Sequence, residues 1–170
     1  MVPVGQLMTV TRALATIDAL KELYVTDTVP SFSAMLRETL NGRLKPDAQT
    51  FVEMIAEDGV MEFPYAPPGF AHRLEGREAI AAHLQSLAGL LEFNNVADVV
   101  KHETTDPEVV IIEFSAFGRG LVTGEPYEQR YISVIRVCDG QIGRYQDYWN
   151  PIAVFRTLRG REFVESLAAG

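Results

Sequence analysis

Apolar and polar residues follow two different periods along the chain, and the change of period divides the sequence into two halves. In the first half, apolar residues recur at steps of three or four, which is the spacing of an amphipathic helix. In the second half, runs rich in Val, Ile, Phe and Tyr are separated by short turn sequences, as expected for strands. Helices followed by strands predict an α+β domain in which helices cover one face of a sheet.

The helical half contains four predicted helices. The first spans residues 7–24, with an apolar stripe that must bury against this core or a partner subunit. Ser31 is the expected N-cap of the second, which ends at Asn41-Gly42. Asp47 is the expected N-cap of the third, which stops at Asp58-Gly59. The fourth opens at Gly76 and carries its stripe on Ile80, Leu84, Leu87 and Leu91.

Six strands are expected, two short ones before the fourth helix and four longer ones after it. The segment VMEFPYA, from Val60, predicts an edge strand because an edge tolerates Pro64, and a short strand near residues 72–74 can pair with it. Four longer strands follow at residues 93–103, 108–122, 127–138 and 141–149. Asp139-Gly140 is a strong hairpin signal, since both central residues of a type I′ turn need positive φ. The long strands therefore predict an antiparallel meander.

Composition narrows the range of partners. The 170 residues are enough for one core, and the formal net charge of −8 argues against binding to a nucleic acid backbone. The three histidines show no metal-ligand spacing, and the single cysteine, Cys138, excludes an intrachain disulfide. No apolar run approaches the roughly 20 residues of a membrane span. We expect a cytoplasmic protein without metal or cofactor and without membrane or nucleic acid contacts.

Asp147 is the first candidate for chemistry, because it lies in the segment RYQDYWNP between aromatic residues. Strand residues alternate faces, so Asp147 shares one face with Tyr145 and Trp149. Aromatic rings displace water, and a carboxylate that loses hydration has a raised pKa, which suits proton exchange near neutral pH. An aspartate that only accepts a structural hydrogen bond, or that faces solvent, remains an alternative.

His83 is the second candidate. It lies between Ile80 and Leu87 at helical spacing, so it flanks the apolar stripe of the fourth helix and can point under the sheet. A neutral imidazole both donates and accepts a proton, which makes it a suitable partner for a carboxylate. A boundary histidine without a chemical role is the alternative. Glu113 and Arg130 are expected on the solvated face of the sheet.

The order of these segments resembles a known superfamily. The stretches FVEMIAEDGVMEF, LEGREAIAAHLQSL and GQIGRYQDYWNPIAVFRTL, in this order, are similar to the SnoaL-like branch of the nuclear transport factor 2-like, or ketosteroid isomerase-like, superfamily. Within that branch, ETTDPEVVIIEFSAFGRG and GEPYEQRYISVIRVCDG are most similar to the phenazine biosynthesis A/B family. The resemblance covers residues 31–158, so residues 1–30 are expected to be an N-terminal helical extension and residues 159–170 a C-terminal tail.

The resemblance implies a cone-shaped fold, in which a strongly bent antiparallel or mixed sheet wraps around the N-terminal helices and a pocket opens at the wide end. It also implies a homodimer formed through the sheet. The family's pocket acid falls on Asp147, and its pocket histidine falls on His83. Leu87 stands where the phenazine proteins have a serine, and the acid is Asp instead of Glu.

Taken together, the residues and the resemblance predict an acid/base enzyme acting on a small hydrophobic carbonyl compound by isomerisation, cyclisation, condensation or dehydration. Asp147 is expected to remove the proton, and His83 to return it or hold the enolate oxygen. The cavity is expected to be lined by aromatic side chains, namely Tyr65, Phe114, Tyr131, Tyr145 and Trp149.

Two rival functions remain open at this stage. The same fold also serves as a noncatalytic module for ligand binding or dimerisation, and a cavity closed by side chains would favour that reading. A limonene-type epoxide hydrolase would need two acids bracketing an arginine in the pocket. Asp147 and Glu113 with Arg130 or Arg119 are the residues available for that arrangement.

Overall fold

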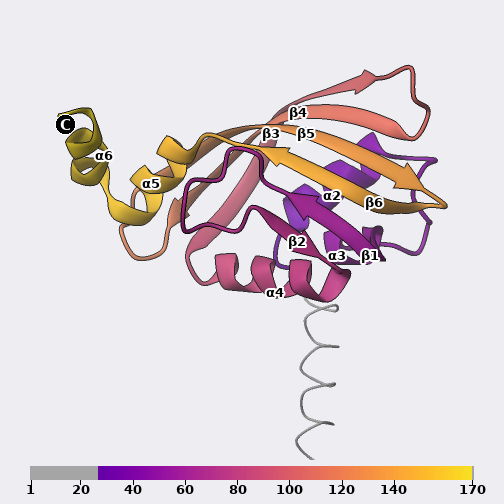
Figure 1. Cartoon of the computed structure of the whole chain (residues 1–170), viewed down its shortest axis with the longest axis horizontal. Helices are drawn as coiled ribbons and strands as arrows, with labels where there is room; N and C mark the ends of the chain where they lie inside the picture. The colour runs from indigo at the N-terminus through magenta and orange to yellow at the C-terminus, as the bar shows by residue number, and fades with distance from the viewer. Residues whose placement is uncertain (1–26, 170) are drawn as a thin grey trace, which may run out of the picture.

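The strands form one curled, open six-stranded sheet, and the computed structural model describes residues 27–169 of the chain (Figure 1). The strands are β1 (Ile55–Glu62), β2 (Arg73–Glu75), β3 (Leu91–Glu103), β4 (Val109–Gly120), β5 (Pro126–Cys138) and β6 (Gln141–Tyr148). The helices are α2 (Pro30–Thr39), α3 (Phe51–Met54), α4 (Arg77–Ala88), α5 (Pro151–Arg159) and α6 (Arg161–Ala168). The predicted α+β class with a bent sheet is confirmed.

The sheet is mixed, with the strand order β2-β1-β6-β5-β4-β3. The long strands β3 to β6 form the predicted antiparallel meander, and β1 alone pairs in parallel, with β6. The β5–β6 hairpin turns at Asp139 and Gly140, whose φ angles of 52° and 75° are the positive values that the turn sequence predicts. The meander places the cavity-facing residues of four consecutive strands on one concave surface.

The start of the sheet differs from the prediction. The third helix is a single turn, capped by Thr50 instead of Asp47: the Thr50 side chain accepts from the backbone N–H of Glu53, whose carboxylate accepts from that of Thr50. The chain turns extended at Ile55 because β1 begins there and pairs with β6. Gly59 therefore lies inside β1 at an irregularity, where an added Cβ would lie 3.1 Å from the carbonyl oxygen of Ile142.

Strand β1 is also not an edge strand. It lies between β2 and β6, while Pro64 lies two positions after its last residue, Glu62, and so takes no part in the ladder. The short strand β2 occupies the edge, pairing with β1 at Val60↔Glu75 and Met61↔Leu74. The proline signal thus marked the end of the strand and not its position in the sheet.

Helices α2, α3 and α4 lie on one side of the sheet (Figure 1). Their apolar faces join the inward-facing strand residues in one core. Side chains that are fully buried in this core include Leu36, Phe51, Met54, Ile80, Ile112, Ile135 and Tyr145.

Two predicted helix ends differ in the structure. Ser31 does not cap α2, since Val29 occupies the N-cap position and Pro30 begins the helix. Leu91, expected on α4, is instead the first residue of β3.

Two helices follow the last strand: α5 lies almost entirely within residues 31–158, and α6 lies within residues 159–170, which were expected to form a C-terminal tail. Asn150 caps α5 by accepting a hydrogen bond from the backbone N–H of Ile152 at 2.9 Å, and Pro151 takes the first helical position. Helix α6 packs against α5 and projects from one end of the sheet (Figure 1). The helix expected over residues 7–24 lies outside the described residues.

Candidate functional site

A cavity of about 140 Å³ lies between the concave face of the sheet and helices α2 and α4, and it is partly open to solvent. Its wall is mostly apolar and rich in aromatic rings: Phe32, Phe51, Phe63, Phe70, Phe93, Phe114, Tyr127, Tyr131 and Trp149. A cavity of about 150 Å³ lined by Leu, Ile and Phe is enough to hold benzene. The space therefore suits a molecule with one six-membered ring, with room to extend through the opening.

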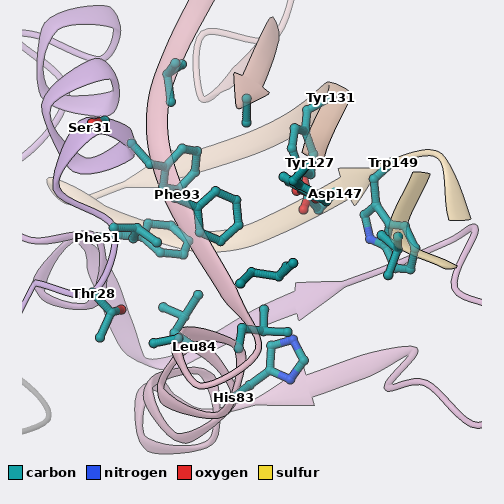
Figure 2. Close-up of a pocket in the computed structure, with 18 of the residues that line it drawn as sticks. Thr28, Ser31, Phe51, His83, Leu84, Phe93, Tyr127, Tyr131, Asp147 and Trp149 are labelled. Atoms are coloured by element: carbon teal, nitrogen blue, oxygen red, sulfur yellow. Dashed lines mark hydrogen bonds between the residues drawn. The ribbon is translucent and has the colours of Figure 1, made fainter. Parts of the chain in front are cut away.

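Asp147 places a carboxyl group in this apolar wall. It comes from the inward face of β6, is only 8% exposed, and lies beside the tyrosine hydroxyls (Figure 2). Burial raises the pKa of Asp147 to about 7, because the surrounding side chains replace the water that would stabilise its charge. The hydroxyl of Ser133 opposes this rise in the pKa by donating a hydrogen bond to the carboxylate at 3.0 Å. The carboxyl group can therefore both accept and release a proton near neutral pH.

Tyr127 and Tyr131 lie next to Asp147 on the inward face of β5 (Figure 2). Their hydroxyls hydrogen-bond to each other at 2.5 Å. Burial raises the pKa of Tyr127 to about 12 and that of Tyr131 well above its ordinary value, so both hydroxyls stay protonated. Since one hydroxyl donates to the other, the pair keeps one hydrogen available for a third acceptor.

His83 reaches the cavity from α4, on the wall opposite Asp147 (Figure 2). Its ring packs against that of Phe63, with 5.4 Å between the centroids. Burial lowers the pKa of His83, so the imidazole is neutral near pH 7. Within residues 27–169, no hydrogen bond joins His83 to Asp147. A bound molecule would lie between the two groups.

One end of the cavity is formed by Trp149, which packs against Phe70 with 6.2 Å between ring centroids. The next residue, Asn150, is held by the side chain of Gln129, which donates to its carbonyl and accepts from its N–H, each at 2.9 Å. This pair of bonds fixes the chain directly after Trp149.

The structure brings together five of the predicted site residues: Asp147, His83, Phe114, Tyr131 and Trp149 all line the cavity. Tyr131 stacks on Phe114, with 4.9 Å between ring centroids and 13° between the planes. Two predicted tyrosines lie elsewhere. Tyr65 is 64% exposed and packs against Tyr148 in a turn after β1. Tyr145 points inward but lies behind the wall, where its hydroxyl donates to Ser133 at 2.7 Å.

The residues considered for an epoxide hydrolase do not meet in the cavity. Glu113 faces away from it and pairs with His102 and Arg130 at 2.9 and 3.3 Å. Arg119 pairs with Glu92 at 2.6 Å. Because these ion pairs lie on the exposed face of the sheet, none of these residues supplies a second acid or an arginine beside Asp147, and this arrangement is ruled out for them.

Several residues in the cavity wall, and Ser133 behind it, were not predicted as site residues. Tyr127 shares the inward face of β5 with Tyr131 and Ser133, so strand alternation was enough to find it. Ser133 was grouped with Tyr131, but its role in supporting Asp147 depends on the register between β5 and β6, which pairs the two residues. Ser31 and Asn95 also line the cavity, and no periodicity marked them.

Neither a metal centre nor a membrane span is found in the part of the chain that the structure describes. Residues 27–169 contain no group of three or more His, Cys, Asp or Glu side chains arranged to hold a metal ion. Across the same residues, none of the helices combines the length and the apolar character that crossing a membrane requires.

A curled sheet whose concave face is covered by helices over an apolar cavity is the fold of a solved NTF2-like protein from Burkholderia xenovorans, which superimposes with a TM-score of 0.57 at 23% identity and covers 76% of this chain and 91% of its own. More narrowly, residues 34–145 match the SnoaL-like domain, and the chain belongs to this family. An uncharacterized PhzA/B-like protein of Pseudomonas aeruginosa is 42% identical over 124 residues, covering 73% of this chain and 87% of that protein. The resemblance to the phenazine A/B proteins is thereby confirmed.

Solved structures agree with this assignment. A structure described as an inferred isomerase from Bacillus subtilis is 37% identical, covers 75% of this chain and 92% of its own, and superimposes with a TM-score of 0.65. A phenazine biosynthesis-related protein from Pseudomonas aeruginosa has a TM-score of 0.59 at 21% identity, covering 76% of this chain and 83% of its own. At that identity the second match shows the fold alone.

Proposed function

We propose that the protein is an acid/base enzyme that acts, without a cofactor, on a small and largely apolar carbonyl compound. The observation that carries this proposal is the buried carboxyl group of Asp147. It lines an apolar cavity large enough for one ring, and its pKa is raised to about 7. A general base is most effective when its pKa is close to the working pH. Isomerisation, cyclisation, condensation and dehydration can all begin with removal of a proton next to a carbonyl group.

In the proposed first step, the carboxylate of Asp147 takes a proton from the carbon beside the carbonyl group. The electron pair of the broken C–H bond moves to the carbonyl oxygen and forms an enolate. The hydrogen that the Tyr127–Tyr131 pair has available can be donated to that oxygen, because both hydroxyls stay protonated. The protonated Asp147 then returns its proton to the enolate, which restores the carboxylate, and the neutral His83 can hydrogen-bond to the enolate oxygen.

Relatives support a reaction of this kind. The Bacillus subtilis structure at 37% identity is described as an inferred isomerase. Structures with the same fold include an inferred polyketide cyclase from Xanthomonas campestris, at 21% identity. Both descriptions are compatible with proton transfer next to a carbonyl group, and neither fixes the substrate of this chain.

The test is a proton exchange assay that needs no knowledge of the natural substrate. Full-length protein is incubated in D₂O with a panel of cyclic ketones, and deuterium at the carbon next to the carbonyl is measured by NMR. We expect exchange with at least one ketone, and a loss of about 10²- to 10⁴-fold in Asp147→Asn, the usual contribution of a general base. Glu128→Gln, which removes a carboxylate from the exposed side of β5, is the matched control. Equal exchange by wild type and Asp147→Asn would contradict the proposal.

A noncatalytic ligand-binding protein is the second candidate. The wide separation of the two titratable groups favours it, since His83 and Asp147 lie on opposite walls (Figure 2). Under this alternative, ketones bind in the cavity and no variant exchanges deuterium. The open cavity argues against a purely structural dimerisation role, because such a module has no need for an accessible interior.

We also propose that the chain forms a homodimer through the exposed face of its sheet. Val100, Glu113, Ile132 and Tyr148 lie in register across four neighbouring strands on that face. Val100 and Ile132 are 45% and 44% exposed, so two apolar side chains face solvent on either side of the ion-paired Glu113. Apolar side chains in the centre of a sheet face are stabilised when a partner covers them.

A further inference from the structure

The charged side chains of the cavity wall are of one sign, negative. Asp147 is the only acidic residue, and no Lys or Arg is present, among the described residues that form its wall. Arginines on neighbouring elements are engaged elsewhere. Arg77 donates to the backbone carbonyl of Ile55 at 2.7 Å, Arg156 pairs with Glu125 at 3.4 Å, and Arg159 lies over the ring of Phe163. A negatively charged ligand would find no cationic side chain in this wall.

The other titratable groups of the wall do not supply a positive charge either. Among the described residues of the wall, His83 is the only basic group, and burial lowers its pKa, so it is neutral in the range where Asp147 ionises. Tyr127 and Tyr131 face Asp147 from β5, and Tyr145 lies beside it on β6. Their pKa values are raised, so all three remain neutral. Above neutral pH, the wall therefore carries a single negative charge.

We propose that the cavity selects ligands by charge: it binds a one-ring molecule that carries an ammonium group most tightly, a neutral molecule less tightly, and a carboxylate least. The inference rests on the proposed function for the location of the site, and it names the class of substrate. It concerns binding alone, so it can be tested without turnover.

Three physical effects support this order. Opposite charges a few ångströms apart attract strongly where water is excluded, and like charges repel as strongly. An ammonium group beside Asp147 replaces part of the hydration that the carboxylate loses on burial. Aromatic rings also attract cations through their faces, and the wall contains many rings. A carboxylate would lose its own hydration and gain no compensating partner.

Benzylamine, benzyl alcohol and benzoate test the order, because they share a ring and differ in charge. Binding to the full-length protein is measured by calorimetry at pH 8.5, where Asp147 is ionised and benzylamine is largely protonated. We expect benzylamine to bind at least about tenfold more tightly than benzyl alcohol, and benzoate at least about tenfold more weakly. At pH 5.5 the preference for benzylamine should shrink, because Asp147 is then protonated.

The variant Asp147→Asn should bring all three affinities to within about threefold of one another, while Glu128→Gln should keep the wild-type order. Benzoate binding as tightly as benzylamine would overturn the inference, and so would an unchanged order in Asp147→Asn or no binding of any probe. The charge order found without deuterium exchange would leave the inference standing and remove the enzymatic proposal. Deuterium exchange by a protein that binds all three probes equally would support the enzymatic proposal and overturn the inference of charge selection.

Discussion

Ser133 and Asp147 face each other across β5 and β6, and the serine hydroxyl donates to the carboxylate at 3.0 Å. The same serine oxygen accepts a hydrogen bond from the hydroxyl of Tyr145 at 2.7 Å. The donation stabilises the ionised form of Asp147, whereas burial destabilises it, and burial has the larger effect on the pKa. The balance of these two effects sets the pH range in which the cavity can transfer a proton.

Replacing the serine tests this balance. In Ser133→Ala the carboxylate loses its hydrogen bond, so the pKa of Asp147 should rise from about 7 by roughly one to two units, the usual value of a bond to a charged group. The titration of the Asp147 carboxyl carbon, followed by NMR, measures the change. Tyr145→Phe is the matched control, because it keeps the serine and removes only the bond behind it. A larger shift in the control than in Ser133→Ala would contradict this account.

The raised pKa of Asp147 also predicts how stability depends on pH. The folded protein binds a proton here up to about pH 7, whereas the unfolded chain releases it near the ordinary aspartate pKa of 3.8. Between these values the native state holds more protons, so the free energy of unfolding falls as pH rises. Stability from this group is complete below the unfolded pKa and is lost as pH rises through the folded pKa.

Asp147→Asn should remove this dependence. Wild type should lose up to about 3 kcal/mol of unfolding free energy through this group between pH 5 and pH 8.5, because its folded pKa lies above its unfolded pKa. The variant should not show this loss, so its stability relative to wild type should rise by the same amount over this pH range. Urea denaturation of both proteins at the two pH values provides the measurement. Glu128→Gln should track wild type, and parallel curves for wild type and Asp147→Asn would show that burial does not shift the carboxyl group.

The homodimer proposal predicts a clear effect at Ile132. Ile132→Glu replaces an exposed apolar side chain of the proposed interface with a second carboxylate beside Glu113, so the dimer should dissociate to monomers at micromolar concentration because a buried unpaired charge is costly. Sedimentation velocity measures the mass. Ile152→Glu, on α5 and similarly exposed, should leave the dimer intact. A wild-type monomer, or an Ile132→Glu dimer as stable as wild type, would refute the proposed interface.

Strand alternation carried most of the information about the site. It placed Tyr145, Asp147 and Trp149 on one face, and all three do point inward. Alternation gives the face but not the depth, so it could not separate Tyr145, which lies behind the wall, from Tyr131, which lines the cavity. The position of Tyr65 depends on a turn after β1 that periodicity does not describe.

Two features of the fold show where local signals compete. Phe51, Met54 and Ile55 have the spacing of a helix, yet the helix ends after one turn because Ile55 pairs with β6, a partner distant in sequence. The helix after β6 was missed although its signal was present. Asn150 followed by Pro151 is a typical helix start, with an N-cap side chain and a proline in the first turn.

The hydrogen bonds between Gln129 and Asn150 help to set the shape of the cavity. A primary amide offers a donor and an acceptor together, so Gln129 holds the backbone of Asn150 much as a neighbouring strand would. Trp149, one residue earlier, is thereby fixed against Phe70 at the end of the cavity. The position of this aromatic side of the cavity is thus set by a glutamine that takes no part in the cavity wall.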